Sequence, residues 1–344
     1  MSKVAIHTAP NSGFVLTVGD SLIALLPDSA GGIEDTSGLV MHTGGAELNT
    51  VVGLSRLGVF TSWLGRLGDD PLGRRVLRTL ADEGVDTTLV VHDPSAPTGL
   101  YLREWRPDGM RRPFYYRKES AGSRLAVRDW PDPWPDSLAV PDVLHVTGIT
   151  LALSDGASDA VESMVEKGRD LGCMISFDPN YRQNLWPDAA TARAALCRLV
   201  DRADLVMLSE EDAELLVAST DPDHVLDAVS SHGPQQVVFK RGAKGAVASR
   251  GHERVTVAAE PVAAAVDPVG AGDAFNAGFL AATLADTPLH DAVRLGAFCG
   301  ARAVEHIGEH TGSPRSADLP PNLRSLLLVS PSQKGSVGRS GSGF

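Results

Sequence analysis

Short apolar runs alternate with amphipathic stretches along the first part of the chain, which predicts alternating strands and helices. Residues 14–27 are apolar and are predicted as one strand with its exit, and a helix is expected over 44–58. Apolar strands are predicted at 59–64 and 85–91, on either side of a second helix that follows Pro71 and Gly73 and ends at Gly84. This β-α-β-α-β order predicts a layered α/β fold with a largely parallel sheet.

The same alternation returns in the second half of the chain. Further strands are expected at 142–149, 173–178, 204–209 and 236–240. Helical spacing separates them near 156–171, 189–201 and 210–217. Residues 262–266 predict one more strand, and residues 274–285 predict the helix that follows it. The sequence contains no internal repeat.

Two segments break the pattern. Residues 98–105 and 112–118 carry aromatic and basic side chains at strand-like spacing, with Pro107-Asp108-Gly109 as a turn between them. They predict a hairpin outside the main sheet, together with residues 33–43. Such a hairpin could cover a site, and an ordinary surface hairpin is the alternative that the pattern leaves open.

Composition narrows the class of protein. The chain has 344 residues, 43% hydrophobic and 22% charged, which is typical of a globular protein with a sizeable core. The formal net charge of -12 argues against nucleic acid or an anionic membrane as a partner. Three scattered cysteines without a CxxC favour a reducing compartment. Asp20 interrupts the first apolar segment, so no signal peptide is expected, and the cytoplasm is favoured.

One stretch, DPVGAGDAFNAGF, places a carboxylate where a predicted helix begins behind a glycine turn. Gly270 and Gly272 let the backbone expose its N–H groups, and the start of a helix carries the positive end of its dipole. This arrangement suits a phosphate. Asp273 would repel an anion there, but it makes sense as a base that takes a proton from an attacking hydroxyl. A simple capping role for Asp273 is the alternative.

The classical nucleotide motifs do not help, because the chain has no GxxxxGK[ST] and Phe275 stands where GxGxxG needs its last glycine. However, DPVGAGDAFNAGF resembles the C-terminal signature of the ribokinase-like (PfkB) carbohydrate kinases. GGAELNTVVGLSRLG followed by GRLGDDPLG resembles the N-terminal signature of that family. The resemblance runs from about residue 14 to about residue 325.

Within that family, the chain is most similar to the 2-keto-3-deoxygluconate kinases, through GGAELN, TGLYLREW, FYYRKESAGS, DPNYRQNLW and FKRGAKG. The resemblance implies a central, mostly parallel sheet flanked by helices, with a small β lid formed from about 33–43 and 97–118. It implies one kinase domain over 14–329. Composition predicts a flexible, polar N-terminus (1–13) and a disordered Gly/Ser-rich tail (330–344) on either side of it. The resemblance also implies Mg²⁺-dependent transfer from ATP to the 6-hydroxyl of a 2-keto-3-deoxy sugar acid.

The resemblance assigns roles to individual residues. Asp273 matches the catalytic base, and Gly270, Ala271 and Gly272 match the anion hole. The implied substrate residues are Gly44, Gly45, Asn49, Tyr101, Tyr115, Arg117, Arg182 and Glu309. The implied nucleotide-side residues are Ser209, Lys240, Arg241, Gly242, Gly245, Gly270 and Gly272. No side chain is assigned as a metal ligand.

Arg117 and Arg182 favour an acidic substrate, because guanidinium groups pair with a carboxylate through planar hydrogen bonds. Solvated surface ion pairs are the alternative for both. Three positions depart from the family pattern: Pro268 replaces a common Thr, Ser209-Glu210-Glu211-Asp212 replaces N-x-x-E, and Glu309 replaces an expected Asp. Glu309 keeps the charge but adds a methylene group.

Other functions remain as alternatives. HIGEH at 306–310 fits the H-x-x-E-H zinc-hydrolase pattern, but a glycine separates the ligands and no downstream His or Glu supplies a third. A non-catalytic sugar-binding protein would not need Asp273 with both glycines. Kinases of fructose, ribose or a nucleoside are possible on the same fold. The expected partners are the sugar acid and ATP, and an exposed lid edge strand could form a homo-oligomer.

Overall fold

The computed structural model describes residues 13–28, 32–105 and 111–328. The predicted turn at 107–109, the terminal residues 1–12 and the tail at 330–344 lie outside the described residues. Within the described part, no helix is both long and apolar enough to cross a membrane.

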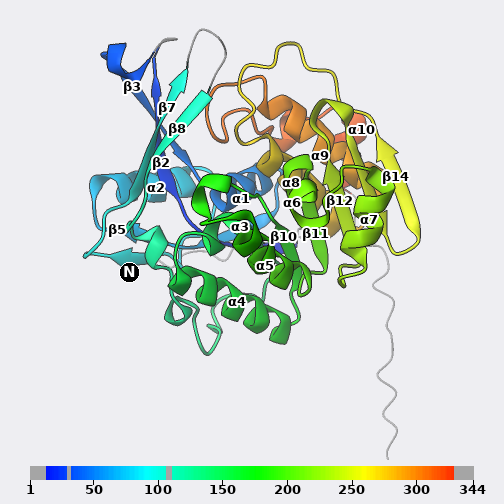
Figure 1. The fold of residues 1–344 in the computed structure, drawn as a ribbon, viewed down its shortest axis with the longest axis horizontal. Helices are drawn as coiled ribbons and strands as arrows, with labels where there is room; N and C mark the ends of the chain where they lie inside the picture. Colours follow the sequence, from blue (N-terminus) through cyan, green and yellow to red (C-terminus); the bar gives the residue numbers. More distant parts are fainter. Residues whose placement is uncertain (1–12, 29–31, 106–110, 329–344) are drawn as a thin grey trace, which may run out of the picture.

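Eight strands form the main sheet (Figure 1). In sheet order they are β14 (Glu253–Val257), β13 (Ala246–Arg250), β12 (Gln236–Lys240), β11 (Leu205–Ser209), β10 (Met174–Asp178), β9 (Val143–Thr147), β1 (Phe14–Val18) and β4 (Phe60–Leu64). The strands from β12 to β4 are parallel, whereas β13 and β14 add an antiparallel edge. The prediction of a mostly parallel α/β sheet is therefore confirmed.

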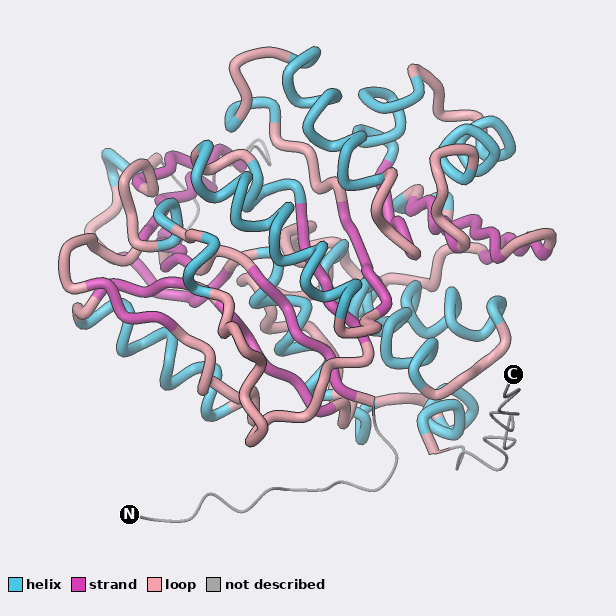
Figure 2. Tube along the Cα trace, turned by 90° about the horizontal axis from the view of Figure 1, so that it is seen from below, coloured by secondary structure: helices cyan, strands magenta, loops and turns pink. Residues whose placement is uncertain are grey.

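Helices cover both faces of this sheet, as Figure 2 shows. One face packs against α4 (Asp155–Asp170), α5 (Ala189–Val200), α6 (Glu210–Val217) and α7 (Pro222–Ser230). The other face packs against α8 (Ala271–Leu284), α9 (Leu289–Ala303), α10 (Pro321–Leu327) and the end of α1 (Ala46–Arg56). Strand β1 shows why both faces are apolar: Leu16 and Val18 enter the first core, and Val15 enters the second.

A second, four-stranded sheet stands apart from the first and forms the lid, at the upper left of Figure 1. Its order is β3 (Leu39–Gly44), β2 (Leu22–Pro27), β7 (Gly99–Trp105) and β8 (Arg111–Tyr116). The predicted hairpin is β7 with β8, and β3 lies in the same sheet, as expected from residues 33–43. The short helix α3 (Gly148–Leu151) follows β9, and α2 (Pro71–Asp82) packs near β2 and β3.

Three strand predictions were wrong. Residues 14–27 form two strands in different sheets, because the chain leaves the first strand at Gly19 and the buried Asp20 and Ser21 lie between the two. Residues 85–91 contribute an isolated bridge from Asp86 to Ser62 and the first residue of β6 (Val91–Asp93), which pairs with β5 (Arg66–Gly68). Residues 262–266 form no strand: most are exposed, and the backbone of Val266 bonds to Val304 instead. Helix α8 also begins earlier than predicted, at Ala271.

Candidate active site

A cavity of about 1210 Å³ lies between the lid and the main sheet. Asp178, Ser209 and Lys240 line it, and they are the last residues of β10, β11 and β12. The carboxyl ends of three neighbouring parallel strands therefore meet at the cavity, which is the usual place for a ligand in an open α/β sheet.

The structure brings most of the predicted residues to this cavity. Those that line it are Gly45, Asn49, Tyr101, Tyr115, Arg117, Arg182, Ser209, Lys240, Gly242, Gly245, Gly270, Ala271, Gly272, Asp273 and Glu309. Gly44 and Arg241 do not line it. Gly44 lies directly behind, since a Cβ there would be 2.4 Å from the Glu309 side chain. Arg241 closes the turn after β12 by donating its backbone N–H to Gly245.

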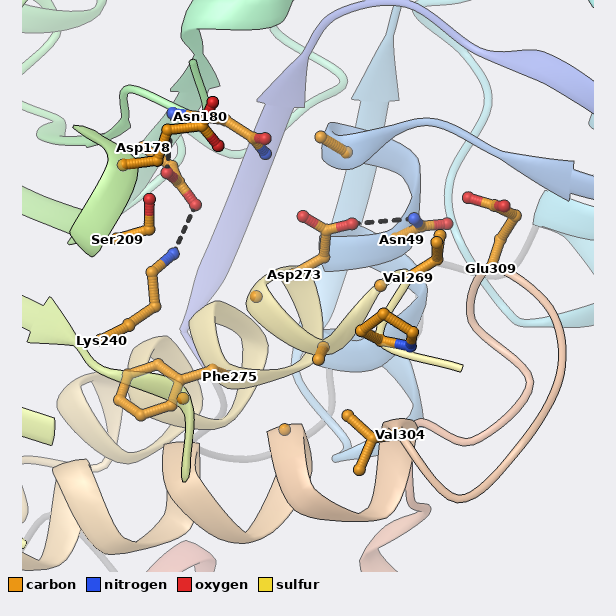
Figure 3. Close-up of a pocket in the computed structure, with 18 of the residues that line it drawn as sticks. Asn49, Asp178, Asn180, Ser209, Lys240, Val269, Asp273, Phe275, Val304 and Glu309 are labelled. Atoms are coloured by element: carbon orange, nitrogen blue, oxygen red, sulfur yellow. Dashed lines mark hydrogen bonds and ion pairs between the residues drawn. The ribbon is translucent and has the colours of Figure 1, made fainter. Parts of the chain in front are cut away.

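Asp273 lies in the first turn of α8 and points into the cavity (Figure 3). Its carboxylate accepts a hydrogen bond of 2.8 Å from the Asn49 amide, which comes from α1. Burial raises the pKa of Asp273 to about 7, the Asn49 hydrogen bond opposes this, and the charge of Asp178 adds to it. The helix N-cap is Gly270, without a side-chain hydrogen bond, so Asp273 is not a simple capping residue.

The backbone before Asp273 forms a cradle of N–H groups at the start of α8, of which that of Ala271 donates to the Pro268 carbonyl at 3.3 Å. Gly270 adopts a left-handed conformation (φ 78°), and a Cβ there would lie 1.9 Å from the carbonyl oxygen of Glu309. Only glycine fits this position without displacing the chain. The first N–H groups of the 14-residue helix α8 lack intrahelical partners and carry the positive end of the dipole, so they can hold a phosphoryl group.

Lys240 supplies a positive charge beside this cradle. Its ammonium group lies 2.7 Å from Asp178 and donates to the Asn276 side chain at 3.0 Å, while Asn276 donates to Asp178 at 2.6 Å. Burial alone would raise the pKa of Asp178, but the Lys240 charge and these hydrogen bonds bring it below its usual value. A Cβ on Gly272 would lie 3.7 Å from the Lys240 ammonium, so this charge reaches the cradle.

Ser209 has a structural partner. Its hydroxyl donates to Asp212 at 2.6 Å, and the two residues form a capping box at the start of α6. Burial and the nearby charge of Asp178 raise the pKa of Asp212. The segment that departs from N-x-x-E therefore places a buried carboxyl, Asp212, at the cavity wall.

The lid side of the cavity contains the aromatic and basic residues. The Tyr101 hydroxyl donates to Glu309, and the pKa of Glu309 is raised by burial although this bond and Arg103 oppose the rise. Arg117 is buried, pairs with Asp20 at 2.9 Å and lies over the Tyr115 ring at 5.4 Å. It is therefore not a solvated surface ion pair.

Arg182 differs from Arg117. Its side chain is exposed and donates to the Tyr181 carbonyl at 2.9 Å. Among the described residues, no carboxylate forms an ion pair with Arg182 within 4.0 Å. The charge of Arg182 nevertheless reaches Asp273: it lowers the pKa of that carboxyl, although burial raises this pKa by more.

Several functional candidates were missed from the sequence, namely Asp20, Glu47, Arg103, Asp178, Asn180 and Asp212. Asp178 could have been found, because it ends a predicted strand. Glu47 is fully buried, accepts hydrogen bonds of 2.7 Å from Thr147 and Thr150, and has its pKa raised by burial to about 7. With Asp20 it makes the end of the cavity beside Arg117 acidic.

The zinc alternative receives no support. Helix α9 ends at Ala303, so His306 and His310 do not share a helical face. His306 is exposed, and burial lowers the pKa of His310 to about 4. Within 13–28, 32–105 and 111–328, no group of three or more His, Cys, Asp or Glu side chains could hold a metal ion.

Comparison with known proteins identifies relatives over nearly the whole chain. Residues 13–315 match the pfkB family carbohydrate kinase model. The chain is 35% identical to the 2-dehydro-3-deoxygluconokinase of Bacillus subtilis over 305 residues, covering 88% of this chain and 93% of that protein. It is 34% identical to the fructokinase of Salmonella typhimurium over 312 residues, covering 89% and 97%. An E. coli protein named as Ribokinase II, solved with ATP and Mg²⁺, superposes with a TM-score of 0.81 at 27% identity, covering 92% and 99%.

Proposed function

The chain belongs to the pfkB family of carbohydrate kinases, and on that premise we propose that it transfers the γ-phosphoryl group of ATP to the 6-hydroxyl of 2-keto-3-deoxygluconate or a close relative. Residues 14–329 form the kinase domain in this proposal. The observation that carries it is the buried Asp273 carboxyl, with its pKa raised to about 7, in the first turn of α8 beside the N–H cradle.

The geometry supports a base and a charge acceptor side by side. Asp273 takes the proton of the attacking hydroxyl, because a carboxyl with a pKa near 7 is partly ionised and basic enough at neutral pH. Gly270 and Gly272 present backbone N–H groups to the transferred phosphoryl group, with Ala271 between them at the start of α8. Lys240 lies at the same place and adds its charge. Phosphoryl transfer relies mainly on such positioning and electrostatic stabilisation.

The cavity contains separate groups suited to the phosphates of ATP, to its adenine ring and to Mg²⁺. The cradle and Lys240 suit the phosphates of ATP, and the apolar wall that includes Phe275, Ala297 and Val304 suits its adenine ring. Mg²⁺ commonly binds through substrate phosphates, waters and one or two carboxylates. This agrees with the described residues, which contain single cavity-wall carboxylates such as Glu210 and Glu211 but no metal cluster. When bound, Mg²⁺ neutralises phosphate charge; the proton transfer is assigned to Asp273.

Arg182 supports an acidic substrate. Its exposed guanidinium group at the cavity is available to a carboxylate, and a bidentate pair there would orient the substrate. The similarity to the Bacillus subtilis 2-dehydro-3-deoxygluconokinase supports the same substrate class. A sugar kinase that uses ATP, with three free cysteines, also fits the cytoplasm.

A second candidate, a fructose kinase, is favoured by one specific observation. Arg117 already pairs with Asp20, whose charge also acts on the buried Glu47, so this end of the cavity accepts hydroxyl groups more readily than a carboxylate. A neutral sugar would suit such a surface. The similar identity to the Salmonella typhimurium fructokinase gives this candidate comparable support.

The test is ADP release with Mg-ATP on 2-keto-3-deoxygluconate, its galactonate epimer, fructose, ribose and adenosine, with Asp273→Asn beside the parent. Turnover on a keto-deoxy acid that is lost in the variant would support the proposal. Turnover on fructose alone would replace the substrate with the second candidate. Turnover unchanged in Asp273→Asn would contradict the assignment of the base.

A further inference from the structure

A buried ion pair joins the lid to the loop that precedes α8. Arg103 of β7 contacts Asp267 through both ends of its guanidinium group, at 3.1 Å to Oδ1 and 2.5 Å to Oδ2. The two side chains are 4% and 1% exposed. Tyr101 and Arg103 are two positions apart on one strand, so both project from the same face of the lid, toward the cavity.

Asp267 connects three segments. Besides Arg103, its carboxylate accepts from the backbone N–H of Val269 in its own loop and of Gly308 in the segment after α9, both at 3.3 Å. Its own backbone N–H donates to Val304 at 3.0 Å. The carboxylate thus fixes the 267–270 loop relative to both the lid and the 304–309 segment.

The second lid contact acts on the same segment. Tyr101 donates to the side chain of Glu309, and the carbonyl of Glu309 is the group against which Gly270 packs. Arg103 and Tyr101 together therefore hold both sides of the backbone on which the N–H cradle depends. The lid that carries them also carries Tyr115 and Arg117, which face the sugar end of the cavity.

We propose that Arg103 is a positioning residue, whose pair with Asp267 sets the geometry of the cradle and couples it to the seating of the lid over the substrate. The inference rests on the proposed kinase function for its catalytic consequence. A planar guanidinium spans both carboxylate oxygens and fixes an angle as well as a distance, which a lysine ammonium cannot do. Arg103→Lys should therefore preserve the charge but loosen the cradle.

A buried ion pair that only stabilises the fold is the competing explanation. Arg66 offers a matched control, since it is also buried and pairs with Asp93 at 3.0 Å and Asp129 at 3.1 Å without lining the cavity. Loss of either guanidinium leaves a buried carboxylate without its full set of donors. Only Arg103 should affect catalysis beyond its effect on stability.

The experiment compares Arg103→Lys, Asp267→Asn and their double variant with Arg66→Lys. For the sugar that the parent phosphorylates best, Arg103→Lys should lower kcat roughly 100-fold, the scale of a misplacement of about 1 Å. The KM for ATP should change by less than about threefold, and the double variant should lose little more than the worse single variant. Arg66→Lys should lower Tm but leave kcat within about threefold of the parent.

A kcat retained in Arg103→Lys would overturn the proposal, and so would an equal fall in Arg103→Lys and Arg66→Lys. If Arg103→Lys does not fold, the kcat of Asp267→Asn tests the proposal in its place, because Asn keeps the volume of Asp and one acceptor oxygen. Amide hydrogen exchange over residues 266–275 separates this inference from the proposed function, since it needs no substrate. Faster exchange in Arg103→Lys than in Arg66→Lys supports the inference even if no sugar is turned over, and unchanged exchange overturns it.

Discussion

Replacing the catalytic candidate Asp273 by Asn should make the protein more stable at neutral pH while abolishing most of its activity. Asn keeps the volume of Asp and one oxygen that can accept the 2.8 Å hydrogen bond from Asn49. It removes the negative charge that is buried near Asp178. The variant therefore separates the energetic cost of a buried carboxylate from the packing of α8.

The magnitude follows from the shift in the pKa of Asp273, from 3.8 to about 7. At ~1.4 kcal/mol for each pH unit between these values, ionising Asp273 costs the folded state about 4 kcal/mol. Because the folded state binds this proton more tightly than the unfolded state, the contribution of Asp273 to the free energy of unfolding falls as pH rises from about 4 to 7. It is constant above about 7.

The assay is urea unfolding of parent and variant between pH 5.5 and 8.5, chosen as roughly the range in which such shifts are measurable. As pH rises toward 7, the variant's free energy of unfolding should exceed that of the parent by an additional ~1.4 kcal/mol per pH unit. Above pH 7 this difference should level off. Asp159→Asn, at an exposed position of α4, is the control and should give a constant difference. In parallel, kcat of Asp273→Asn should fall by about 10²- to 10⁴-fold.

A difference in stability that does not depend on pH would refute the reasoning, because burial would then not raise the pKa of Asp273. A variant that is less stable than the parent at pH 8, without the slope, would show that Asn49 needs the charged carboxylate. For the parent, kcat/KM should fall about tenfold per pH unit below a pKa near 7, since only the ionised base accepts the proton.

Three further predictions concern the rest of the cavity. Gly270→Ala should lower both Tm and kcat, because its Cβ would lie 1.9 Å from the Glu309 carbonyl; thermal unfolding and steady-state kinetics measure this, and a wild-type Tm would contradict it. Arg182→Ala should raise KM about tenfold or more for a sugar acid and little for fructose, and equal effects would remove the carboxylate pairing. Glu309→Asp shortens the side chain and withdraws its carboxylate from the Tyr101 hydroxyl. Sugar binding should weaken several-fold while the KM for ATP stays unchanged, as competition kinetics would show.

The sequence predicted the part of the fold that depends on local patterns. The parallel strands β9 to β12 are largely apolar runs, the first three followed by helical spacing, and their bounds agree with the prediction to within a few residues. It did not predict that residues 14–27 divide between two sheets: Asp20 marks a break in the apolar run, but no local pattern shows that the second half pairs with β3 and β7. The strand expected at 262–266 failed because residues 262–265 are exposed and the backbone N–H of Val266 donates to the Val304 carbonyl instead.

The residues of the candidate site likewise fall into those that a local motif predicts and those that depend on the tertiary fold. Gly270, Gly272 and Asp273 lie within four residues at one helix start, so a short motif was enough to bring them together. The pair of Arg103 and Asp267 spans 164 positions and depends on how the lid docks, which no local pattern encodes. Arg117 could be placed near the substrate from its neighbours, but its partner Asp20 was hidden inside a stretch interpreted as a single strand.

The environments of two neighbouring carboxylates explain why Asp273, and not Asp178, is the candidate for the base. Both are buried at the cavity, and burial by itself would raise the pKa of each. Asp178 is bonded to the Lys240 ammonium and Asn276, which hold its pKa below the usual value and keep it ionised at neutral pH. Asp273 has one neutral donor, Asn49, and feels the charge of Asp178, so its pKa rises toward 7. Two carboxylates with pKa values pushed apart take different roles: one orients a cation beside the cradle, and the other can exchange a proton.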